Sequence, residues 1–422
     1  MIELPNVPAA ALARQVVREL RKLGHVAYLA GGCVRDLILQ RTPKDYDVAT
    51  SALAEQVEAA FRKTVAVGKS FGVITVLGDT SGVMVEVATF RHDGPYSDGR
   101  HPDSVRFTNA EEDAARRDFT INALFLDPET GEVVDYVNGV RDLEARVVRA
   151  VGDPAVRFSE DKLRLLRAVR FACALNFDID DATLEAIKRM ALEVSVCSKE
   201  RIRDELNKML LNPGRGRAFG LLFETSLLEA VLPEVAALHG KQSSDGNLLK
   251  RTLLCLDLLT NPPALAVAWA ALLRELGPGQ AVNILRRLRS TNDLTQRVEM
   301  ILTDSPRFAT LAQLTLAQQK RFLRKPGIED DLELLRTCCL AGVAEANHAR
   351  LAKQKLDEFR QAGRDALWPT LPISGDDLRA LGIAPGPVYK DLLTALEDEM
   401  LEGRIRTKEQ ALAYVRSRHP AA

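Results

Sequence analysis

The feature that most restricts the fold of this chain is the stretch 29–50, which reads LAGGCVRDLILQRTPKDYDVAT. Its pattern predicts a strand, a turn at Gly31 and Gly32, a helix over 34–39 and a second strand around 45–48. Glycines lack side chains, so the backbone N–H groups of this turn can approach a phosphate, and the start of the following helix favours an anion. The stretch therefore predicts an α/β element whose turn can cradle a triphosphate.

Carboxylates near this turn suit a reaction that needs divalent cations. Asp45 and Asp47 are two residues apart, so on a strand both side chains leave the same face and can share such cations. Glu86 lies in the apolar run VMVEVATF, where a charge is expected to face a metal or a cation. Glu86 is therefore the candidate third ligand, although an exposed strand face explains it better when it is taken alone. A lone Gly-Gly is usually only a turn, and a lone aspartate pair is usually only a solvated loop. The glycines and the aspartates indicate a functional site because they occur together, in the order strand, turn, helix, strand.

Two later motifs offer groups that can recognise a nucleotide. RRDFTINAL contains Arg117, Asp118 and Asn122, whose donors and acceptors can recognise a ribose 2′-hydroxyl. In EDKLR, Asp161 and Arg164 are three residues apart, so on a helix they share one face and present a carboxylate beside a guanidinium. Without the preceding motifs, a surface salt bridge is the simpler interpretation of this pair.

The pattern of apolar residues changes after about Pro154. Short β-type runs alternate with helical segments before it, and amphipathic helices follow it, the first over 160–174. We therefore expect an α+β fold, with a mixed-sheet head followed by an all-helical neck, body and tail. The expected domains are a head at 1–150, a neck at 151–236, a body at 237–345 and a tail at 346–422.

Composition limits the partners and the location. With 57 Lys and Arg against 58 Asp and Glu, a nucleic-acid partner must be held by a local basic surface. The six cysteines form no CxxC pair, which argues against a zinc ribbon or a disulfide framework. The start has no secretory pattern, and no run approaches about 18 apolar residues. We expect a cytoplasmic protein without membrane-spanning segments.

GGCVRD followed by DYD resembles the nucleotidyltransferase signature of the polymerase β superfamily. More narrowly, it is similar to that of the class II tRNA nucleotidyltransferases, or CCA-adding enzymes, and the bacterial poly(A) polymerases. Four later stretches are similar to further motifs of this family, in the same order: RRDFTINALFLDP, DYVNGVRDL, EDKLRLLRAVRFA and RIRDELNKML. The resemblance covers roughly residues 25–230. It implies the same architecture, a mixed-sheet head followed by helices.

The resemblance implies template-independent addition of CCA to the 3′ end of tRNA from CTP and ATP, with Mg²⁺ as cofactor and pyrophosphate as product. By the same resemblance, Asp45 and Asp47 bind two metal ions that activate the RNA 3′-hydroxyl and hold the triphosphate. Glu86 joins them as a catalytic residue, while Asp161 and Arg164 read the Watson–Crick edges of CTP and ATP. The implied nucleotide-binding residues are Gly31, Gly32, Arg35, Arg117, Asp118, Asn122, Asp161 and Arg164.

Several alternatives remain open. An A-adding tRNA nucleotidyltransferase and a poly(A) polymerase share these motifs and rank second and third. A protein of a different class, a catalytically silent RNA-binding protein on the same scaffold, is disfavoured because Asp45, Asp47, Asp161 and Arg164 are all intact. Arg35 also fits an ordinary ion pair on a helix surface. The sequence indicates no protein partner and no oligomeric state.

The body resembles an HD-type phosphohydrolase module that has lost its metal ligands. RTLL at Arg251 stands where such modules carry HTLL, and LLRELGP, with Arg274 and Glu275, stands where they carry LLHDVGK. A guanidinium has no lone pair with which to bind a metal. We therefore expect a degenerate helical scaffold without phosphatase activity.

Two other segments offer candidate RNA or phosphate contacts. The stretch 89–107 is similar to the flexible loop of the family, and the last helices are similar to its tail. The candidate cations are Arg91, Arg100 and Arg106 in the loop, and Lys390, Arg404, Arg406 and Lys408 in the tail.

Overall fold

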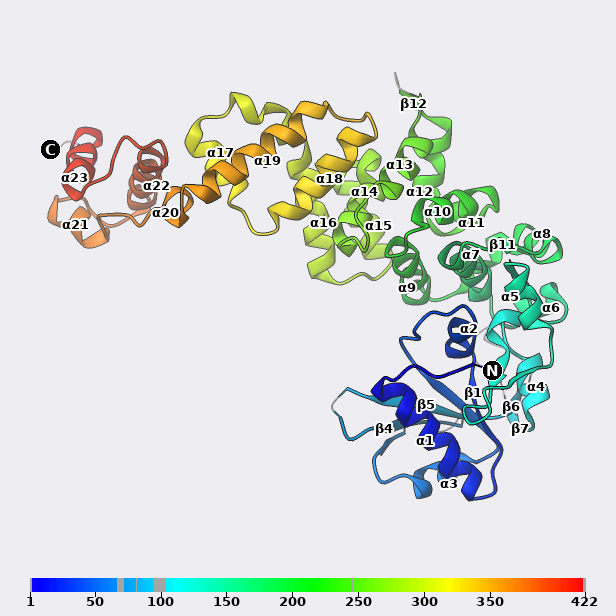
Figure 1. Cartoon of the computed structure of the whole chain (residues 1–422). Helices are drawn as coiled ribbons and strands as arrows, with labels where there is room; N and C mark the ends of the chain where they lie inside the picture. The colour runs from blue at the N-terminus through cyan, green and yellow to red at the C-terminus, as the bar shows by residue number, and fades with distance from the viewer. Residues whose placement is uncertain (1, 67–71, 81, 95–103, 244–245, 420–422) are drawn as a thin grey trace. The chain divides into compact units, whose positions relative to one another are not determined.

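The computed structural model describes residues 2–66, 72–80, 82–94, 104–243 and 246–419. The chain divides into two units, Met1–Ala237 and Leu238–Ala422, whose elements are labelled in Figure 1. The division falls next to the expected start of the helical body at 237. The expected boundaries at 150 and 345 remain predictions. No helix in the described part of the chain combines the length and apolar character needed to span a membrane.

A seven-stranded mixed sheet forms the head of the first unit, in the order β3-β4-β5-β2-β1-β8-β9. Strands β2 and β5 pair in parallel, and the other neighbours pair antiparallel. In sheet order, the strands are Thr64–Val65, Val73–Leu77, Met84–Thr89, Asp47–Thr50, Ala27–Ala30, Leu124–Leu126 and Val133–Asp135. The expected mixed-sheet head followed by helices is confirmed.

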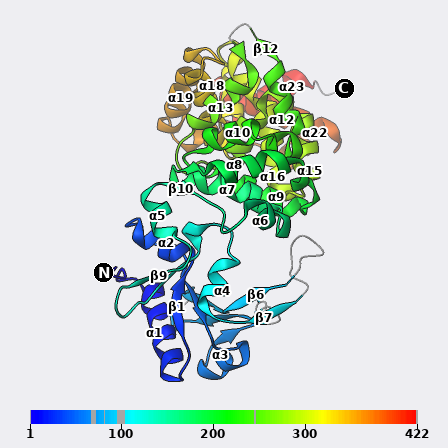
Figure 2. The same ribbon diagram turned by 90° about the vertical axis from the view of Figure 1, so that its right-hand side faces the viewer.

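Helices cover both faces of this sheet. Helix α1 (Pro8–Lys22) lies beside β1 (Figure 2) and packs on β1, β2 and β5 with buried residues spaced three and four apart. On the other face, Ala110 and Ala114 of α4 (Ala110–Ala115) share an apolar cluster with Ala30, Ala49 and Phe125 of the sheet. Side chains alternate between faces along β2, so Asp47 lies on the same face as Ala49, the face that α4 covers.

Shorter elements complete the head. Helix α2 (Gly32–Ile38) follows β1, and α3 (Ala54–Ala60) packs on β4 and β5. A separate antiparallel pair joins β6 (Arg91–Asp93) to β7 (Val105–Phe107). The 3₁₀ helix η2 (Thr120–Asn122) precedes β8, and α5 (Gly139–Glu144) packs against it.

The helices after the head belong to the same unit. Helix α7 (Leu163–Leu175) is buried along most of its length and packs on α9 and α10. Around it lie α6 (Pro154–Glu160), α8 (Asp181–Met190), η3 (Ala191–Val196), α9 (Lys199–Leu210), α10 (Arg215–Glu224), α11 (Leu227–Val231) and α12 (Pro233–Ala236). A short parallel pair, β10 (Val147–Val148) with β11 (Asp178–Ile179), ties the end of the head to the turn after α7.

Two of the expected elements differ from the structure in ways that affect the site. The second strand begins only at Asp47, and Asp45 lies in a bend before it, so these residues do not share one strand. The helix expected over 160–174 is broken, because Asp161 is extended at φ −143° and ψ 106° between α6 and α7. The inference that Asp161 and Arg164 share one helix face was therefore wrong.

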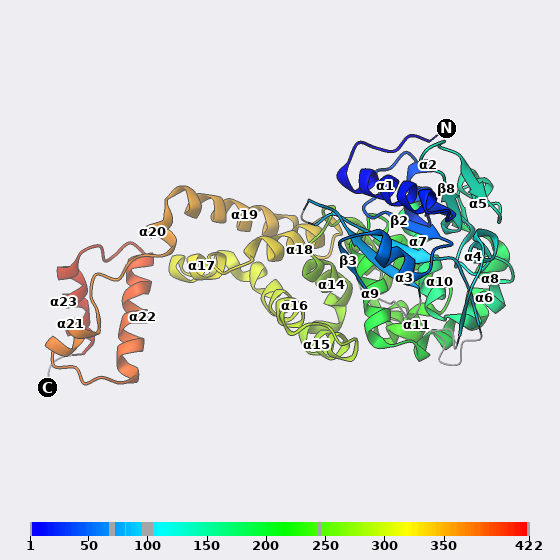
Figure 3. The same ribbon diagram turned by 90° about the horizontal axis from the view of Figure 1, so that it is seen from below.

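The second unit is helical in its described part, apart from the short pair β12 (Gln242–Ser243) and β13 (Gly246–Asn247). One apolar cluster runs from Phe308 to Leu367, across the expected boundary at 345, and a second joins α21, α22 and α23 (Figure 3). The helices are α13 (Leu248–Asp257), α14 (Leu265–Leu273), α15 (Gly277–Arg287), α16 (Asn292–Asp304), α17 (Leu316–Leu323), α18 (Ile328–Leu340), α19 (Ala346–Gln361), α20 (Arg364–Leu367), α21 (Gly375–Ala380), α22 (Pro387–Leu401) and α23 (Lys408–Arg418).

The residues compared with an HD module form an ion cluster in this unit. The carboxylate of Glu275 contacts Nη2 of Arg274 and, at 3.5 Å, Nη2 of Arg251. Both arginines are therefore engaged with a carboxylate at the positions where metal ligands would stand. The expected lack of phosphatase activity stays a prediction.

Two of the four candidate cations in the tail are engaged within the protein. Arg404 pairs with Glu399, and Nζ of Lys408 lies 2.6 Å from Asp377 Oδ1. These pairs compete with RNA phosphates for the same charges. Contacts of Lys390 and Arg406 with RNA phosphates stay predictions, because the contacts within the protein do not test them.

Gly139, at the start of α5, packs so closely on η2 that a side chain does not fit. A Cβ added there would lie 2.2 Å from the backbone oxygen of Thr120. We expect Gly139→Ala to lower the stability of the first unit by about 1–3 kcal/mol, because the backbone must shift. The control is Gly279→Ala in α15, where a Cβ meets nothing within 4 Å. Calorimetric unfolding should show a lower transition temperature for the first variant only, and equal temperatures would contradict the packing.

Candidate active site

A cleft of about 540 Å³ opens in the first unit between the sheet, the turn after β1 and helices α7 and α9. Every site residue expected from the sequence lines this cleft, except Asp45. The polar and aromatic lining consists of Gly31, Gly32, Arg35, Asp47, Glu86, Arg116, Arg117, Asp118, Asn122, Asp161, Arg164, Arg167, Phe171 and Arg201. The fold therefore gathers motifs from widely separated parts of the chain.

The parallel pairing of β2 with β5 places two carboxylates side by side. Asp47 and Glu86 are directly paired in the strand register, so their side chains leave the same face. Asp47 is half-buried, whereas Glu86 and Asp45 are exposed. Burial, and then the negative charges of Glu86 and Asp45, raise the pKa of Asp47 to about 6, against the opposing effect of Arg117. Asp45 thus acts on Asp47 electrostatically although it does not line the cleft.

The carboxylates fit a divalent cation that is shared with a substrate. Among the residues that the structure describes, no group of three or more His, Cys, Asp or Glu side chains could hold a metal ion. Mg²⁺ is commonly bound by one or two carboxylates together with the phosphates of a substrate. Asp45 and Asp47 offer such a pair of hard oxygen donors, and a bound cation would relieve the charge repulsion that raises the pKa of Asp47.

The glycine turn is packed against the same residues. Gly31 has φ +75°, and a Cβ added there would lie 2.9 Å from Nη1 of Arg117 and 4.0 Å from Oδ2 of Asp47. A side chain at this position would be strained and would also displace Arg117. Only glycine lets the backbone approach both side chains, and the binding of a phosphate at this turn stays a prediction.

Asp118 is a buried acceptor that organises the second motif. Its Oδ1 accepts hydrogen bonds from the Phe119 N–H at 2.8 Å and from Asn122 Nδ2 at 3.1 Å. Its Oδ2 accepts from Nε and Nη2 of Arg167 at 2.8 and 2.5 Å. Asn122 Oδ1 in turn accepts from Nη1 of Arg35 at 2.7 Å. These contacts bring together expected site residues from the first and second motifs.

The candidate base-reading pair is held by different partners. Asp161 accepts two hydrogen bonds from Arg201, at 3.1 and 2.7 Å, and one from the Leu163 N–H at 3.0 Å. Arg164 donates to the backbone oxygen of Arg157 at 2.9 Å and contacts the Glu160 carboxylate. The two side chains line one cleft without pairing with each other in these contacts. Each therefore keeps polar groups for a ligand.

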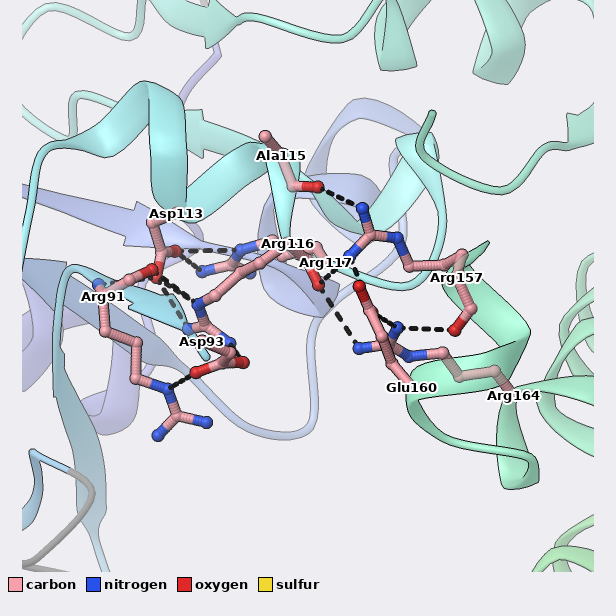
Figure 4. Close-up of polar contacts among 9 residues, drawn as sticks. All are labelled: Arg91, Asp93, Asp113, Ala115, Arg116, Arg117, Arg157, Glu160 and Arg164. Carbon is pink, nitrogen blue, oxygen red and sulfur yellow. Dashed lines mark hydrogen bonds and ion pairs between the residues drawn. The ribbon is translucent and has the colours of Figure 1, made fainter. Parts of the chain in front are cut away.

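Asp113 connects the second motif to Arg164 through Arg116 (Figure 4). Its carboxylate accepts from Arg116 Nη2 at 2.6 Å and from Arg117 Nη2 at 3.0 Å. The backbone oxygen of Arg116 accepts from Arg157 Nη1 at 3.1 Å and from Arg164 Nη2 at 3.3 Å. One buried carboxylate thus fixes two arginines of the cleft, and one of them contacts Arg164 through its backbone.

The candidate cations of the loop are partly engaged elsewhere. Arg91 Nε lies 2.8 Å from Asp93 Oδ1, and Arg106 Nη2 lies 2.7 Å from Glu112 Oε2. Arg100 lies outside the described residues. Phosphate contacts by these arginines stay predictions.

Four charged or aromatic residues that line the cleft were not predicted from the sequence: Arg116, Arg167, Phe171 and Arg201. A signal for Arg167 was present, because it follows Arg164 by three residues and so shares its helix face. Arg201 lies 40 residues after Asp161 along the chain. Its bond to Asp161 depends on two segments meeting in space, which spacing alone cannot reveal.

Three family models match successive parts of the chain. Residues 27–149 match the model of the poly A polymerase head domain, and residues 176–238 match a probable RNA- and SrmB-binding site of polymerase A. Residues 263–415 match the tRNA nucleotidyltransferase domain 2. The last match crosses the expected boundary at 345, as the apolar cluster of the body does.

The similar proteins of comparable length are named CCA-adding enzymes. The CCA-adding enzyme of Lactobacillus delbrueckii subsp. bulgaricus is 34% identical over 95% of this chain and 96% of its own. That of Lactobacillus johnsonii is 35% identical over 97% of each chain. The crystal structure of the Bacillus stearothermophilus CCA-adding enzyme in complex with CTP has a TM-score of 0.78 and 30% identity over 98% of each chain. The chain belongs to the CCA-adding enzyme family of tRNA nucleotidyltransferases.

Proposed function

We propose that this chain adds CCA to the 3′ end of tRNA, taking CTP and ATP and releasing pyrophosphate. Membership of the family supports the reaction, and solved relatives of this fold are complexes with CTP, ATP and tRNA. The observation that carries the choice of nucleotide is the presence of Asp161 and Arg164 in one cleft with Asp47. The six cysteines are all free, which supports a location in the cytoplasm.

An acceptor beside a donor selects two bases out of four. Cytosine and adenine each present an amino donor next to a ring nitrogen acceptor on the Watson–Crick edge, whereas guanine and uracil present an oxygen acceptor next to an N–H donor. Asp161 can accept from the amino group while Arg164 donates to the ring nitrogen. Arg164 uses three of its five N–H hydrogens in the described contacts, which leaves donors for a base.

Nucleotidyl transfer in this family depends on a divalent metal, for which we propose Mg²⁺. Asp45 and Asp47 would hold it together with the oxygens of the triphosphate. A divalent ion held there would lower the pKa of the attacking hydroxyl and neutralise charge on the leaving pyrophosphate. Glu86 stands beside Asp47 in the register of their strands and stays a candidate catalytic residue. The turn at Gly31 and Gly32 would bring backbone N–H groups near the phosphates.

Recognition of the ribose falls to Arg117, Asp118 and Asn122. Asp118 already accepts four hydrogen bonds, so its contribution passes through the groups it holds, Asn122 and Arg167. Asn122 keeps a hydrogen on Nδ2 and Arg117 lines the cleft beside the turn. We propose that these groups select a nucleotide with a 2′-hydroxyl.

The proposal is tested with tRNA transcripts that lack CCA, end in the first C, end in both, or carry the complete end. Each is incubated with Mg²⁺ and single labelled nucleotides. We expect two C residues and then one A to be added, and no extension of the complete end. Addition of A alone would point to an A-adding enzyme, repeated addition of A to a poly(A) polymerase, and no addition to a silent RNA-binding protein.

The same assay tests the carboxylates. We expect Asp47→Asn and Asp45→Asn each to slow nucleotide addition by about 1,000-fold or more, because charge on the metal ligands is lost. Binding of tRNA, measured by gel shift, should change little. The control is Asp79→Asn, whose side chain is fully exposed. Near-normal turnover of both site variants would contradict the assignment of Asp45 and Asp47 as metal ligands.

Arg164→Ala is expected to relax the choice of base. Loss of the donor should reduce the preference for CTP and ATP over UTP and GTP by about 10- to 100-fold, since a good bidentate base contact is worth about 1–3 kcal/mol. Competition between all four nucleotides on a transcript that lacks CCA measures this ratio. The control is Arg189→Ala on the exposed face of α8. An unchanged preference in the Arg164 variant would refute the base-reading role.

Asp118→Asn should remove a contribution to the free energy of unfolding of the first unit that depends on pH. Burial alone would raise the pKa of Asp118, but Arg167 and its hydrogen bonds lower it from 3.8 to about 2. A carboxyl group with a lowered pKa stabilises the fold above its unfolded pKa, and this stabilisation is lost as the pH falls from about 4 to 2. We expect the variant to lose about 2–3 kcal/mol at pH 7 and less at pH 3.

Urea unfolding of the first unit at several pH values measures this difference. The control is Asp391→Asn, an exposed residue of α22. A difference between wild type and Asp118→Asn that stays the same from pH 7 to pH 3 would contradict the electrostatic cause.

A further inference from the structure

Three guanidinium groups surround a single aromatic ring beside the cleft. Phe171, on α7, is 8% exposed and lines the cleft. The Cζ atoms of Arg35 and Arg167 each lie 5.2 Å from the centroid of its ring, and that of Arg170 lies 4.0 Å away. All three fall within the range of cation–π attraction, about 6 Å.

The three arginines come from different motifs and reach different partners. Arg35, on α2, donates to Asn122. Arg167 pairs with Asp118, and Arg170 donates to Glu205 of α9 at 2.5 Å. The ring of Phe171 is therefore the one group that all three arginines contact. Their other contacts lie in the second motif and on α9.

Like charges gathered in this way repel one another. Burial lowers the pKa of Arg170, and the positive charge of Arg167 lowers it further, against the opposing charge of Glu205. Each arginine has a carboxylate or amide partner, but these partners differ from one arginine to the next. The electron-rich face of the ring attracts every guanidinium that lies over it, so it offsets part of the repulsion at their common point.

We propose that Phe171 is a positioning residue for nucleotide binding, which holds Arg35 and Arg167 in the cleft through the π face of its ring. The inference rests on the proposed function and extends it, because Phe171 carries no group that recognises a nucleotide itself. Arg35 and Arg167 fix Asn122 and Asp118, so release of the arginines from the ring loosens the surface that the nucleotide meets. The effect is on affinity for the nucleotide more than on the transfer step.

A ring that only fills the core would behave differently, and fluorination separates the two roles. Fluorine atoms keep the size and apolar character of phenylalanine while they withdraw electrons from the π face. We would replace Phe171 with monofluoro-, difluoro- and trifluorophenylalanine in the full-length protein. The matched control is the same series at Phe158, a fully buried ring on α6 that takes part in no cation–π pair among the described residues.

We expect KM for CTP to rise stepwise with fluorination of Phe171, by about 3- to 10-fold for the trifluoro ring, with kcat changed less than about twofold. Phe171→Leu should raise KM by about tenfold or more, and Phe171→Tyr, which keeps the ring face, should stay within about twofold of the wild type. The Phe158 series should leave KM unchanged. Equal KM values across the Phe171 series, or parallel changes in both series, would overturn the proposal.

Equilibrium binding of labelled CTP without tRNA separates this inference from the proposed function. If the wild type binds CTP but extends no transcript, the proposed function fails, while the Phe171 series still decides the role of the ring. If the wild type extends tRNA and fluorination leaves CTP affinity unchanged, the positioning role alone fails. A wild type that binds neither CTP nor ATP overturns both.

Discussion

The charge balance inside the cleft is the constraint on which the first unit depends. Six arginines line one cavity, and buried or half-buried carboxylates stand between them: Asp113 beside Arg116 and Arg117, Asp118 beside Arg167, and Asp161 beside Arg201. Removing such charges from water is costly, so these pairs add little net stability. Breaking one pair leaves a buried charge alone, so they fix the relative positions of α4, the stretch 116–122 and the break before α7. The geometry of the cleft follows from charges that must not be left unpaired.

Much of the head was predictable because strand periodicity is local, and the exceptions are long-range. The strands that carry Asp47 and Glu86 were expected, but their parallel pairing was not, since alternation along a strand does not reveal its neighbour. The break at Asp161 has a similar origin. No glycine or proline lies between Pro154 and Asn176, so the sequence offers no local stop signal. The extended backbone at Asp161 lets its carboxylate meet Arg201 from another helix, and this tertiary contact outweighs helix propensity.

The candidate site was predictable where a motif carries its own chemistry and not where a residue depends on a partner in space. The glycine turn, Asp47, Asn122 and Arg164 line the cleft as the motifs predicted. Phe171 was hidden in an apolar run, because its neighbours along the helix do not show that Arg35 approaches from another element. In the second unit, helical periodicity gave the helices but not the grouping of their cores, so the apolar cluster across position 345 could not be foreseen.

If Asp161 and Arg164 read the base as proposed, an acceptor and a donor held in one cleft would explain which bases enter, but not the order in which they are added. Cytosine and adenine present the same order of amino donor and ring acceptor, so Asp161 and Arg164 cannot separate them by hydrogen-bond pattern. The two bases differ in size, and a purine needs the pair to stand farther from the ribose. Arg164 is held by two backbone oxygens and the Glu160 carboxylate, and Asp161 by the side chain of Arg201. On the proposed assignment, a change from C to A would require these supports to shift together, since moving one partner alone would break the match with both bases.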